Sequence, residues 1–165
     1  MANITLQGNP FHTNGNLPAV GSTAKDFTLV GTDMAEVSLK SFEGKKKVLN
    51  IFPSIDTGVC ATSVRKFNQE AATLTKVAVL NISVDLPFAM KRFCGVEGIE
   101  NALALSAFRS SFANDFGLKM TDGPFAGLCS RAVIVLDENN KVLYAQQVSE
   151  IADEPDYQAA LKVLK

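Results

Sequence analysis

Residues 48–60, VLNIFPSIDTGVC, decide the fold because they join an apolar run to a short loop and then to a cysteine. The run at residues 48–52 is apolar apart from Asn50 and stops at Pro53, which is typical of a buried strand that ends at a loop. Beyond the loop, apolar residues recur at helical spacing from about residue 59 to residue 74. The stretch therefore predicts a buried central strand followed directly by a helix.

A second apolar run, at residues 77–84, follows this helix, so the unit consists of a strand, a helix and a strand. Such units are almost always right-handed parallel crossovers, and they indicate an α/β core. The arm at residues 1–20 is rich in Gly, Asn and Pro and is expected to form an N-terminal hairpin. The length of the chain suits one domain that spans residues 1–165.

The remaining elements are predicted from apolar periodicity and from the positions of Gly and Pro. Short strands are expected at residues 27–30, 37–39 and 103–105, a single turn at 41–44, a surface loop at 121–127, and a hairpin formed by 131–136 and 142–146. Helices are expected from Pro87 to Cys94 with an end at Gly95, from Phe108 to Phe116 with an end at Gly117, and from Pro155 onward.

The charge of the chain excludes binding that depends on a strong overall field. Sixteen basic and seventeen acidic residues give a net charge of −1, so neither nucleic acid nor an anionic membrane surface is an expected partner. The first ten residues are polar, and no apolar segment approaches the roughly 18 residues of a membrane span. We therefore expect a cytoplasmic protein, in which cysteines are more often catalytic, redox-active or inert than structural disulfides.

Cys60 stands out because it falls in the first turn of the helix that follows the buried strand. A helix N-terminus carries partial positive charge and free N–H groups, so it stabilises a thiolate, which is the nucleophilic form of cysteine. Thr57 can offer its hydroxyl to the sulfur or to a bound oxygen while it caps the helix. Pro53 lacks an N–H and would shield the pocket from water. On position alone, Cys60 could instead be a small buried apolar residue and Thr57 a simple cap.

A resemblance strengthens the catalytic interpretation. Residues 53–60, PSIDTGVC, fit the peroxiredoxin pattern of Pro, three residues, Thr, two residues and Cys, and residues 50–68 resemble the bacterial thiol peroxidase group of peroxiredoxins. The likeness continues at residues 85–89, 92–95, 131–137 and 154–157, so it covers nearly the whole chain. It implies a thioredoxin-like α/β fold, with a central mixed β-sheet flanked by helices and an N-terminal β-hairpin.

The same resemblance implies the roles of individual residues. Cys60 would be the peroxidatic cysteine, with Thr57, Pro53 and Arg131 forming its pocket, whereas without the resemblance Arg131 would be taken for half of a surface ion pair. Cys94 would be the resolving cysteine that forms an intramolecular disulfide with Cys60. Because a disulfide requires Cα atoms within about 7 Å, part of the site is expected to unwind locally if the helices hold the two cysteines further apart.

The resemblance also implies substrates and partners. The substrates would be hydrogen peroxide and organic hydroperoxides, with the organic ones preferred. Thioredoxin would be the reductant, and the chain would form a homodimer. No metal, flavin or haem would be needed.

The sequence assigns no role to Cys129 or His12. Cys129 is expected to be a free thiol, either buried or half-exposed. Two alternatives remain: a thioredoxin-like disulfide oxidoreductase, against which the lack of a C-x-x-C motif weighs, and a non-enzymatic peroxide sensor.

Overall fold

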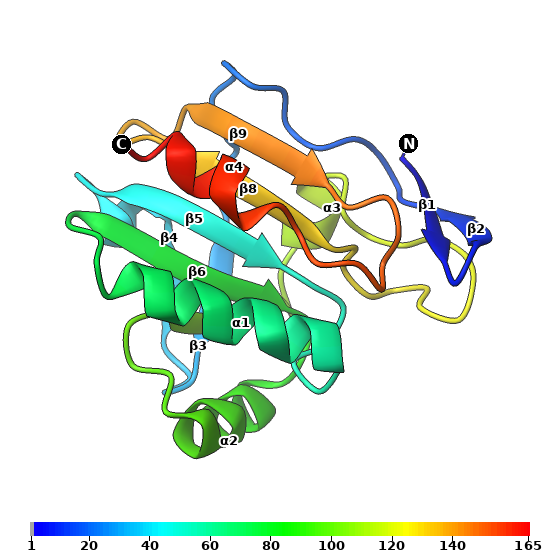
Figure 1. Cartoon of the computed structure of the whole chain (residues 1–165), viewed down its shortest axis with the longest axis horizontal. Coiled ribbons are helices and arrows are strands. Elements are labelled where there is room, and N and C mark those ends of the chain that lie inside the picture. Colours follow the sequence, from blue (N-terminus) through cyan, green and yellow to red (C-terminus); the bar gives the residue numbers. More distant parts are fainter. Residues whose placement is uncertain (1) are drawn as a thin grey trace.

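A seven-stranded mixed sheet forms the centre of the structure, a computed structural model that describes residues 2–165 (Figure 1). The elements in chain order are β1 (Asn3–Leu6), β2 (Asn9–His12), β3 (Thr28–Gly31), β4 (Glu36–Ser38), the 3₁₀ helix η1 (Leu39–Phe42), β5 (Lys46–Ile51), α1 (Gly58–Ala71), β6 (Val77–Ser83), α2 (Pro87–Glu97), β7 (Leu103–Ser106), α3 (Phe112–Asp115), β8 (Ala132–Leu136), β9 (Val142–Gln147) and α4 (Tyr157–Lys162).

The strand order of the sheet is β4-β3-β7-β6-β5-β8-β9. The three central strands β7, β6 and β5 are parallel, whereas β8 pairs antiparallel with β5 and then with β9. The predicted strand–helix–strand unit around residue 60 is confirmed as β5, α1 and β6, and the hairpin near the C-terminus is confirmed as β8 and β9. The sheet is thus mixed, as expected.

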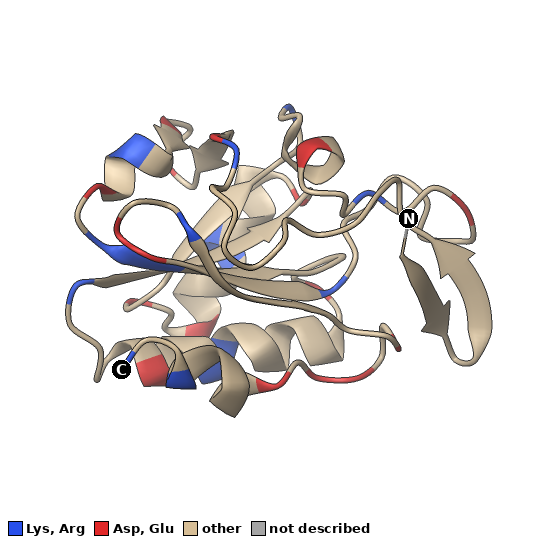
Figure 2. Ribbon diagram, turned by 90° about the horizontal axis from the view of Figure 1, so that it is seen from above, with Lys and Arg blue, Asp and Glu red and all other residues tan. Residues whose placement is uncertain are grey.

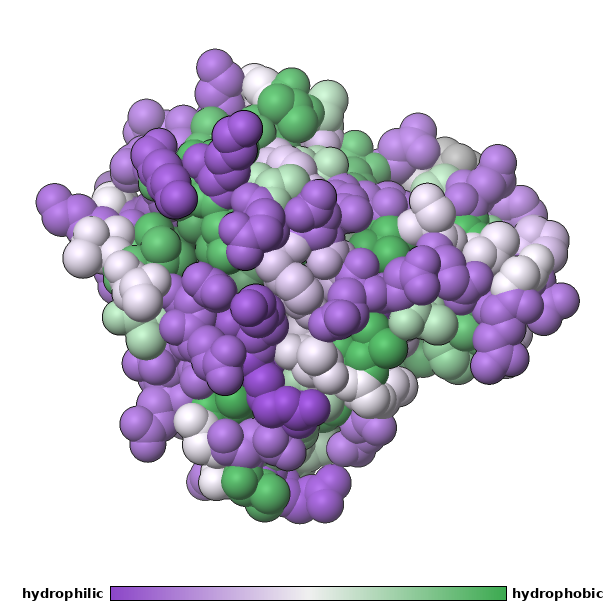
Figure 3. All heavy atoms as spheres, viewed as in Figure 1, coloured by the Kyte–Doolittle hydropathy of each residue, from purple (hydrophilic) through white to green (hydrophobic). Residues whose placement is uncertain are grey.

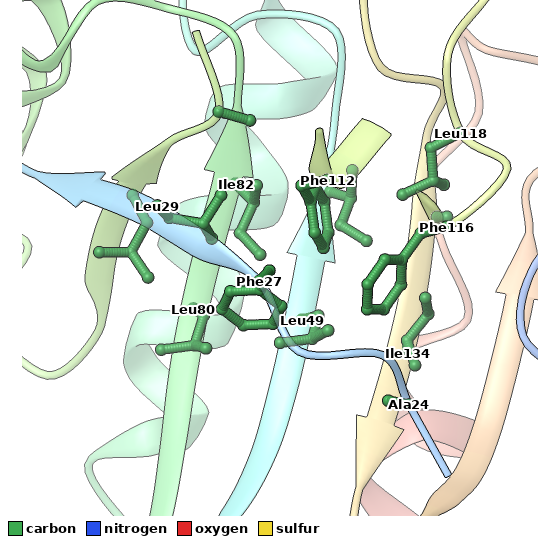
Figure 4. Packing of buried hydrophobic residues seen from close by; sticks show 14 of the residues in the cluster. Ala24, Phe27, Leu29, Leu49, Leu80, Ile82, Phe112, Phe116, Leu118 and Ile134 are labelled. Atoms are coloured by element: carbon green, nitrogen blue, oxygen red, sulfur yellow. The ribbon is translucent and has the colours of Figure 1, made fainter. Parts of the chain in front are cut away.

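Helices cover both faces of the sheet because the central strands are apolar on both sides. Val48 of β5 packs in one cluster with Phe67 of α1 and Leu161 of α4, on the face that is in front in Figure 1. The neighbouring Leu49 points the other way, into a larger cluster with Phe112 of α3. In this second cluster the ring of Phe27 meets that of Phe112 edge-on at 5.4 Å, close to Leu49 and Leu80 (Figure 4).

Four helices have boundaries that differ from the sequence prediction. Helix α1 ends at Ala71 rather than near residue 74, where the N–H and the hydroxyl of Thr73 both donate to the carbonyl of Glu70. Helix α2 runs past Gly95 and ends at Gly98, whose left-handed φ of 65° and N–H bond to the carbonyl of Cys94 form the cap. The helix predicted at residues 108–116 is reduced to α3, since Ser110 and Ser111 favour turn and cap conformations. Helix α4 begins at Tyr157 rather than Pro155, because the carboxylate of Asp156 accepts from the N–H of Ala159.

The N-terminal hairpin of β1 and β2 projects from one side of the molecule (Figures 1 and 2). Its turn consists of Gln7 and Gly8, both with positive φ, as a tight two-residue hairpin turn requires. Basic and acidic residues are interspersed over the rest of the ribbon (Figure 2). Among residues 2–165, no helix is long and apolar enough to cross a membrane.

Candidate active site around Cys60

Cys60 occupies the first turn of α1, as the sequence predicts, and its side chain is fully enclosed. Strand β5 ends at Ile51, a loop follows, and α1 begins at Gly58. Phe52, Ile55 and Val64 surround the cysteine in a small apolar cluster. The sulfur therefore lies at the C-terminal edge of the parallel strands, where functional sites of open α/β sheets are found, and next to a helix N-terminus.

Arg131 reaches the sulfur from the neighbouring strand. Ile51, the last residue of β5, pairs with Ala132, the first residue of β8, so Arg131 stands directly beside the loop that leads to Cys60. Nη2 of Arg131 donates to Sγ of Cys60 at 3.1 Å, and Nε donates to the carbonyl of Ile151 at 2.8 Å. The side chain of Arg131 is buried, so the alternative of a surface ion pair is wrong.

Arg131 brings a buried positive charge to the sulfur of Cys60. No carboxylate among residues 2–165 forms an ion pair with Arg131, although this residue is only 2% exposed. A buried positive charge without a counter-charge is unfavourable, and the sulfur of Cys60 is the side-chain atom that this guanidinium bonds, at 3.1 Å. The amide dipoles at the start of α1 place partial positive charge near the same sulfur.

A cavity of about 250 Å³ opens beside Arg131, whose Nη2 bonds the sulfur of Cys60; the fully buried Cys60 is not itself among the lining residues. Pro53, Thr57, Val59 and Arg131 line it together with apolar side chains from other parts of the chain, namely Leu6, Phe125, Ile151 and Ala152. Nη1 of Arg131 is buried and has no hydrogen-bond partner among the described residues. The cavity thus combines a mostly apolar wall with one cationic residue, Arg131, an arrangement suited to a small molecule with an apolar end and a polar end.

Thr57 differs from the prediction in one respect. It occupies the N-cap position of α1, but its side chain makes no capping hydrogen bond. The hydroxyl donates instead to the carbonyl of Ser54 at 3.2 Å, within the loop that precedes the helix. The prediction that its side chain caps the helix is therefore wrong, because this local turn takes up the hydroxyl.

Cys94 lies on α2 and is half-buried, and burial raises the pKa of its thiol. Neither Cys60 nor Cys94 forms a disulfide in this structure. The neighbouring side chain of Phe93 packs against the apolar cluster around Cys60, so α2 adjoins the site. Arg65 of α1 also bonds Glu97 of α2 at 3.2 Å.

The third cysteine and the histidine lie outside this arrangement. Cys129 is fully buried and unbonded, as expected of an inert thiol, and burial, followed by the charge of Asp85, raises its pKa to about 12. His12, at the end of the hairpin, pairs at 2.8 Å with Asp122 in the segment between α3 and β8. Neither residue lines the cavity beside Cys60.

Several residues of the site were not identified from the sequence. Leu6 and Ile151 have no local pattern that marks them, since they reach the cavity only through the docking of the hairpin. Asp85 is different, because it lies two residues after the end of strand β6, at the edge of the sheet where functional side chains gather. Its carboxylate accepts from the hydroxyl of Ser54 at 2.8 Å and from the N–H of Ile55 at 2.7 Å.

The chain matches one protein family and a relative of known class over most of its length. Residues 19–161 match the Redoxin family. The chain is 58% identical over 164 residues to a thiol peroxidase of Corynebacterium glutamicum, a match that covers 99% of both chains.

Two solved structures share the fold. A peroxiredoxin-like protein from Aquifex aeolicus superposes with a TM-score of 0.93 at 36% identity, over 99% of this chain and 96% of that one. A thiol peroxidase from Chromobacterium violaceum superposes with a TM-score of 0.91 at 24% identity, over 98% and 94% of the two chains, which bears on the fold alone. The thioredoxin-like arrangement expected from the sequence is thereby confirmed, and the chain belongs to the Redoxin family, in the thiol peroxidase group of the peroxiredoxins.

Proposed function

We propose that the protein is a peroxidase that reduces hydroperoxides with Cys60 as the nucleophile. The observation that carries this proposal is the geometry of Arg131, which places Nη2 3.1 Å from the sulfur and leaves a buried Nη1 without a partner among residues 2–165. A fixed cation beside a nucleophile stabilises charge that develops on a reacting oxygen. The cavity at the same place leaves room for the substrate.

In the first step the Cys60 thiolate attacks the terminal oxygen of the hydroperoxide. The S–O bond forms as the O–O bond breaks, so the sulfur is oxidised to a sulfenic acid and the other oxygen leaves as an alkoxide or hydroxide that takes up a proton. Nη1 of Arg131 would hold the leaving oxygen as its charge grows. Thr57 and Pro53 line the cavity, where they would orient the peroxide and limit access of water.

In the second step the Cys94 thiol attacks the sulfenic sulfur, releases water and forms the Cys60–Cys94 disulfide. Because an S–S bond is about 2.05 Å long, the sulfur atoms of Cys60 and Cys94 must come into direct contact. Because the Cys60 side chain is enclosed and bonded to Arg131, it must leave this enclosure to reach a thiol on another helix. The cycle therefore includes a local opening of the loop at residues 53–57 and the first turn of α1, or a movement of α2.

Thioredoxin is proposed as the reductant that restores the two thiols. Its dithiol would take over the disulfide by two exchange steps, with half-buried Cys94 as the more accessible point of attack. A reductant of this kind accords with a cytoplasmic location, which we propose on the same basis. The similarity to thiol peroxidases supports both inferences.

Organic hydroperoxides are proposed as the preferred substrates over hydrogen peroxide. Leu6, Phe125 and Ile151 supply apolar surface to the same cavity that Arg131 lines. An alkyl or aryl group gains free energy from contact with such a wall, at roughly 25 cal/mol per Å² of apolar surface removed from water. Hydrogen peroxide has no apolar group and therefore gains no such free energy from this surface.

A homodimer is proposed through the apolar surface near the start of α2. Leu86 and Phe88 are 52% and 68% exposed, and Phe108, which follows β7, is 39% exposed. The segment before α2 and the segment after β7 adjoin, because the hydroxyl of Ser106 accepts from the N–H of Phe108 and donates to the carbonyl of Asp85. A small apolar patch lies over α2 on the face seen in Figure 3. Exposed aromatic residues of this kind are typical of protein interfaces.

The test is the consumption of cumene hydroperoxide and hydrogen peroxide in the presence of thioredoxin, its reductase and NADPH. Turnover is expected for the wild type, none for Cys60→Ser, and impaired turnover for Cys94→Ser. Activity retained by Cys60→Ser would overturn the proposal. If the wild type is oxidised once but does not turn over, a peroxide sensor is indicated instead. If it reduces disulfides but not peroxides, it is a disulfide oxidoreductase.

A further inference from the structure

We propose that Asp85 is a positioning residue that holds the Cys60 loop in its closed, peroxide-reactive conformation and so sets the balance between attack on peroxide and disulfide formation. This inference rests on the proposed two-cysteine cycle.

Both oxygens of the Asp85 carboxylate are used to hold neighbouring segments. Oδ1 accepts from the hydroxyl of Ser54 at 2.8 Å, and Oδ2 accepts from the N–H of Ile55 at 2.7 Å. Oδ2 also accepts from the hydroxyl of Ser83 at 2.5 Å. Two of these three bonds fix the loop between β5 and α1, and such bonds to a charged acceptor are stronger than those between neutral groups.

The bond to Ile55 acts directly on the surroundings of Cys60. Ile55 is fully buried and packs with Phe52 and Val64 in the cluster that encloses the cysteine. Three residues after Ile55 the helix begins, and the loop between them includes Thr57. A fixed backbone at residues 54 and 55 therefore fixes where α1 starts and where the sulfur meets Arg131.

Asp85 is itself attached to rigid strands. Its N–H donates to the hydroxyl of Ser83, the last residue of β6, at 3.2 Å. Its carbonyl accepts from the hydroxyl of Ser106, the last residue of β7. The loop is thus held against the centre of the sheet rather than against another loop.

Asp85 also adjoins the helix that carries Cys94. Leu86, the next residue, is the N-cap of α2. The side chain of Asp85 therefore anchors the Cys60 loop, and its backbone leads directly into α2, the helix that carries the proposed resolving cysteine. When Cys60 leaves Arg131 to bond to Cys94 and the loop opens, its bonds to Asp85 must break, so Asp85 stabilises the closed state against the open one.

This placement predicts opposite effects on the two halves of the cycle. In Asp85→Asn the amide keeps one acceptor oxygen but loses the charge and the second acceptor. We expect the closed state to be less populated by on the order of tenfold relative to the open state. Reaction with peroxide slows, because Cys60 is at Arg131 for less of the time. Disulfide formation accelerates, and Cys60 becomes more resistant to overoxidation, because the sulfenic acid reaches Cys94 sooner.

The experiment follows the two steps separately by rapid mixing of the reduced protein with cumene hydroperoxide. The second-order oxidation of Cys60 and the first-order formation of the disulfide are resolved, and overoxidised Cys60 is quantified by mass spectrometry. Asp85→Asn is compared with the milder Ser54→Ala, which removes one of the two loop bonds. Asp26→Asn is the matched control, since Oδ1 of Asp26 accepts from the N–H groups of Phe27 and Leu39, away from Cys60.

The expected result is slower oxidation, faster disulfide formation and less overoxidation in Asp85→Asn, smaller changes of the same signs in Ser54→Ala, and wild-type rates in Asp26→Asn. Equal slowing of both steps, or wild-type rates in Asp85→Asn, would overturn the proposal. If Asp85→Asn does not fold, Ser54→Ala decides, and unchanged rates in it count against the proposal. A wild type that forms no Cys60–Cys94 disulfide would contradict the proposed function itself, whatever the variants do.

Discussion

Nη2 of Arg131 lies 3.1 Å from the sulfur of Cys60, although 71 positions separate the two residues in the sequence. They meet because β5 and β8 are antiparallel neighbours and Ile51 pairs with Ala132. The Nε of Arg131 is at the same time bonded to the carbonyl of Ile151, which limits the rotation of the guanidinium. The proposed catalytic pair thus depends on one strand pairing and one backbone carbonyl.

Replacing Arg131 by Lys tests this arrangement. A lysine keeps the charge but has a single nitrogen, which cannot bond the carbonyl of Ile151, the sulfur and a substrate oxygen in the same fixed geometry. We expect kcat/KM for peroxide to fall by roughly 100-fold, as when one preorganised donor is removed from an active site. Arg109→Lys, at an exposed ion pair with Glu36, is the control and should keep wild-type kinetics. Equal kinetics in both variants would exclude the proposed role of Arg131.

The side chain of Leu6 should set the preference between peroxides. It lies on the hairpin strand β1 and lines the cavity beside Arg131. In Leu6→Ala the apolar wall is shortened, so kcat/KM for cumene hydroperoxide should fall by roughly tenfold, whereas that for hydrogen peroxide should hardly change. Val20→Ala, at an exposed aliphatic residue outside the cavity lining, serves as the control. A parallel loss for both peroxides would show that Leu6 acts on the reaction and not on the substrate.

Glu150 holds the hairpin in place, and this attachment should depend on pH. Its carboxylate accepts from the hydroxyl of Thr5 and the N–H groups of Gln7 and Gly8, which lower the pKa of Glu150 to about 2 from its ordinary value of 4.5. Because the pKa is lowered in the folded state, this stabilisation is complete above about pH 4.5 and is lost as the pH falls toward 2.

The amide resonances of Gln7 and Gly8 report this titration directly. We expect their chemical shifts to change with a midpoint near pH 2 in the wild type. In Glu150→Gln this transition should disappear. A wild-type midpoint at the ordinary carboxyl value of 4.5 would mean that these hydrogen bonds do not form in solution.

The sequence was informative where the signal is local. Cys60 could be assigned to the first turn of a helix because Pro53 ends the strand nearby and the helical periodicity starts within a few residues. The end of α2 was misplaced, since Gly95 and Gly98 are equally good candidates for a helix end and only the backbone geometry separates them. The shortened α3 has a similar cause, because the apolar spacing near residue 112 continues through a serine turn.

The contacts that build the cavity are non-local and could not be predicted from the residues alone. Arg131 was assigned to the pocket through the family resemblance, and its contact with the sulfur depends on the pairing of β5 with β8. Leu6 and Ile151 come together only because the hairpin docks on the segment after β9, where the N–H of Ile151 bonds the carbonyl of Thr5 at 2.9 Å. No short-range pattern encodes that docking.

Cys129 is expected to take no part in the cycle. Its side chain is fully enclosed and burial raises its pKa to about 12, so almost no reactive thiolate exists near neutral pH. Cys129→Ala should therefore keep the wild-type kcat/KM for peroxide and the wild-type yield of disulfide. In the folded wild type, iodoacetamide at pH 8 should label Cys129 far more slowly than the half-buried Cys94. Loss of disulfide in Cys129→Ala would assign Cys129 a resolving role.

Phe88 should carry much of the proposed dimer interface. Its ring is 68% exposed on the first turn of α2, beside the exposed Leu86. A charge at this position would have to be desolvated in an interface, so Phe88→Glu should raise the dimer dissociation constant by at least 100-fold. Sedimentation velocity over a range of concentrations measures this constant. Val20→Glu, at a residue that is 64% exposed elsewhere, is the matched control and should dimerise like the wild type. A wild type that remains monomeric at high concentration, or equal dimerisation of both variants, would show that this surface has another role.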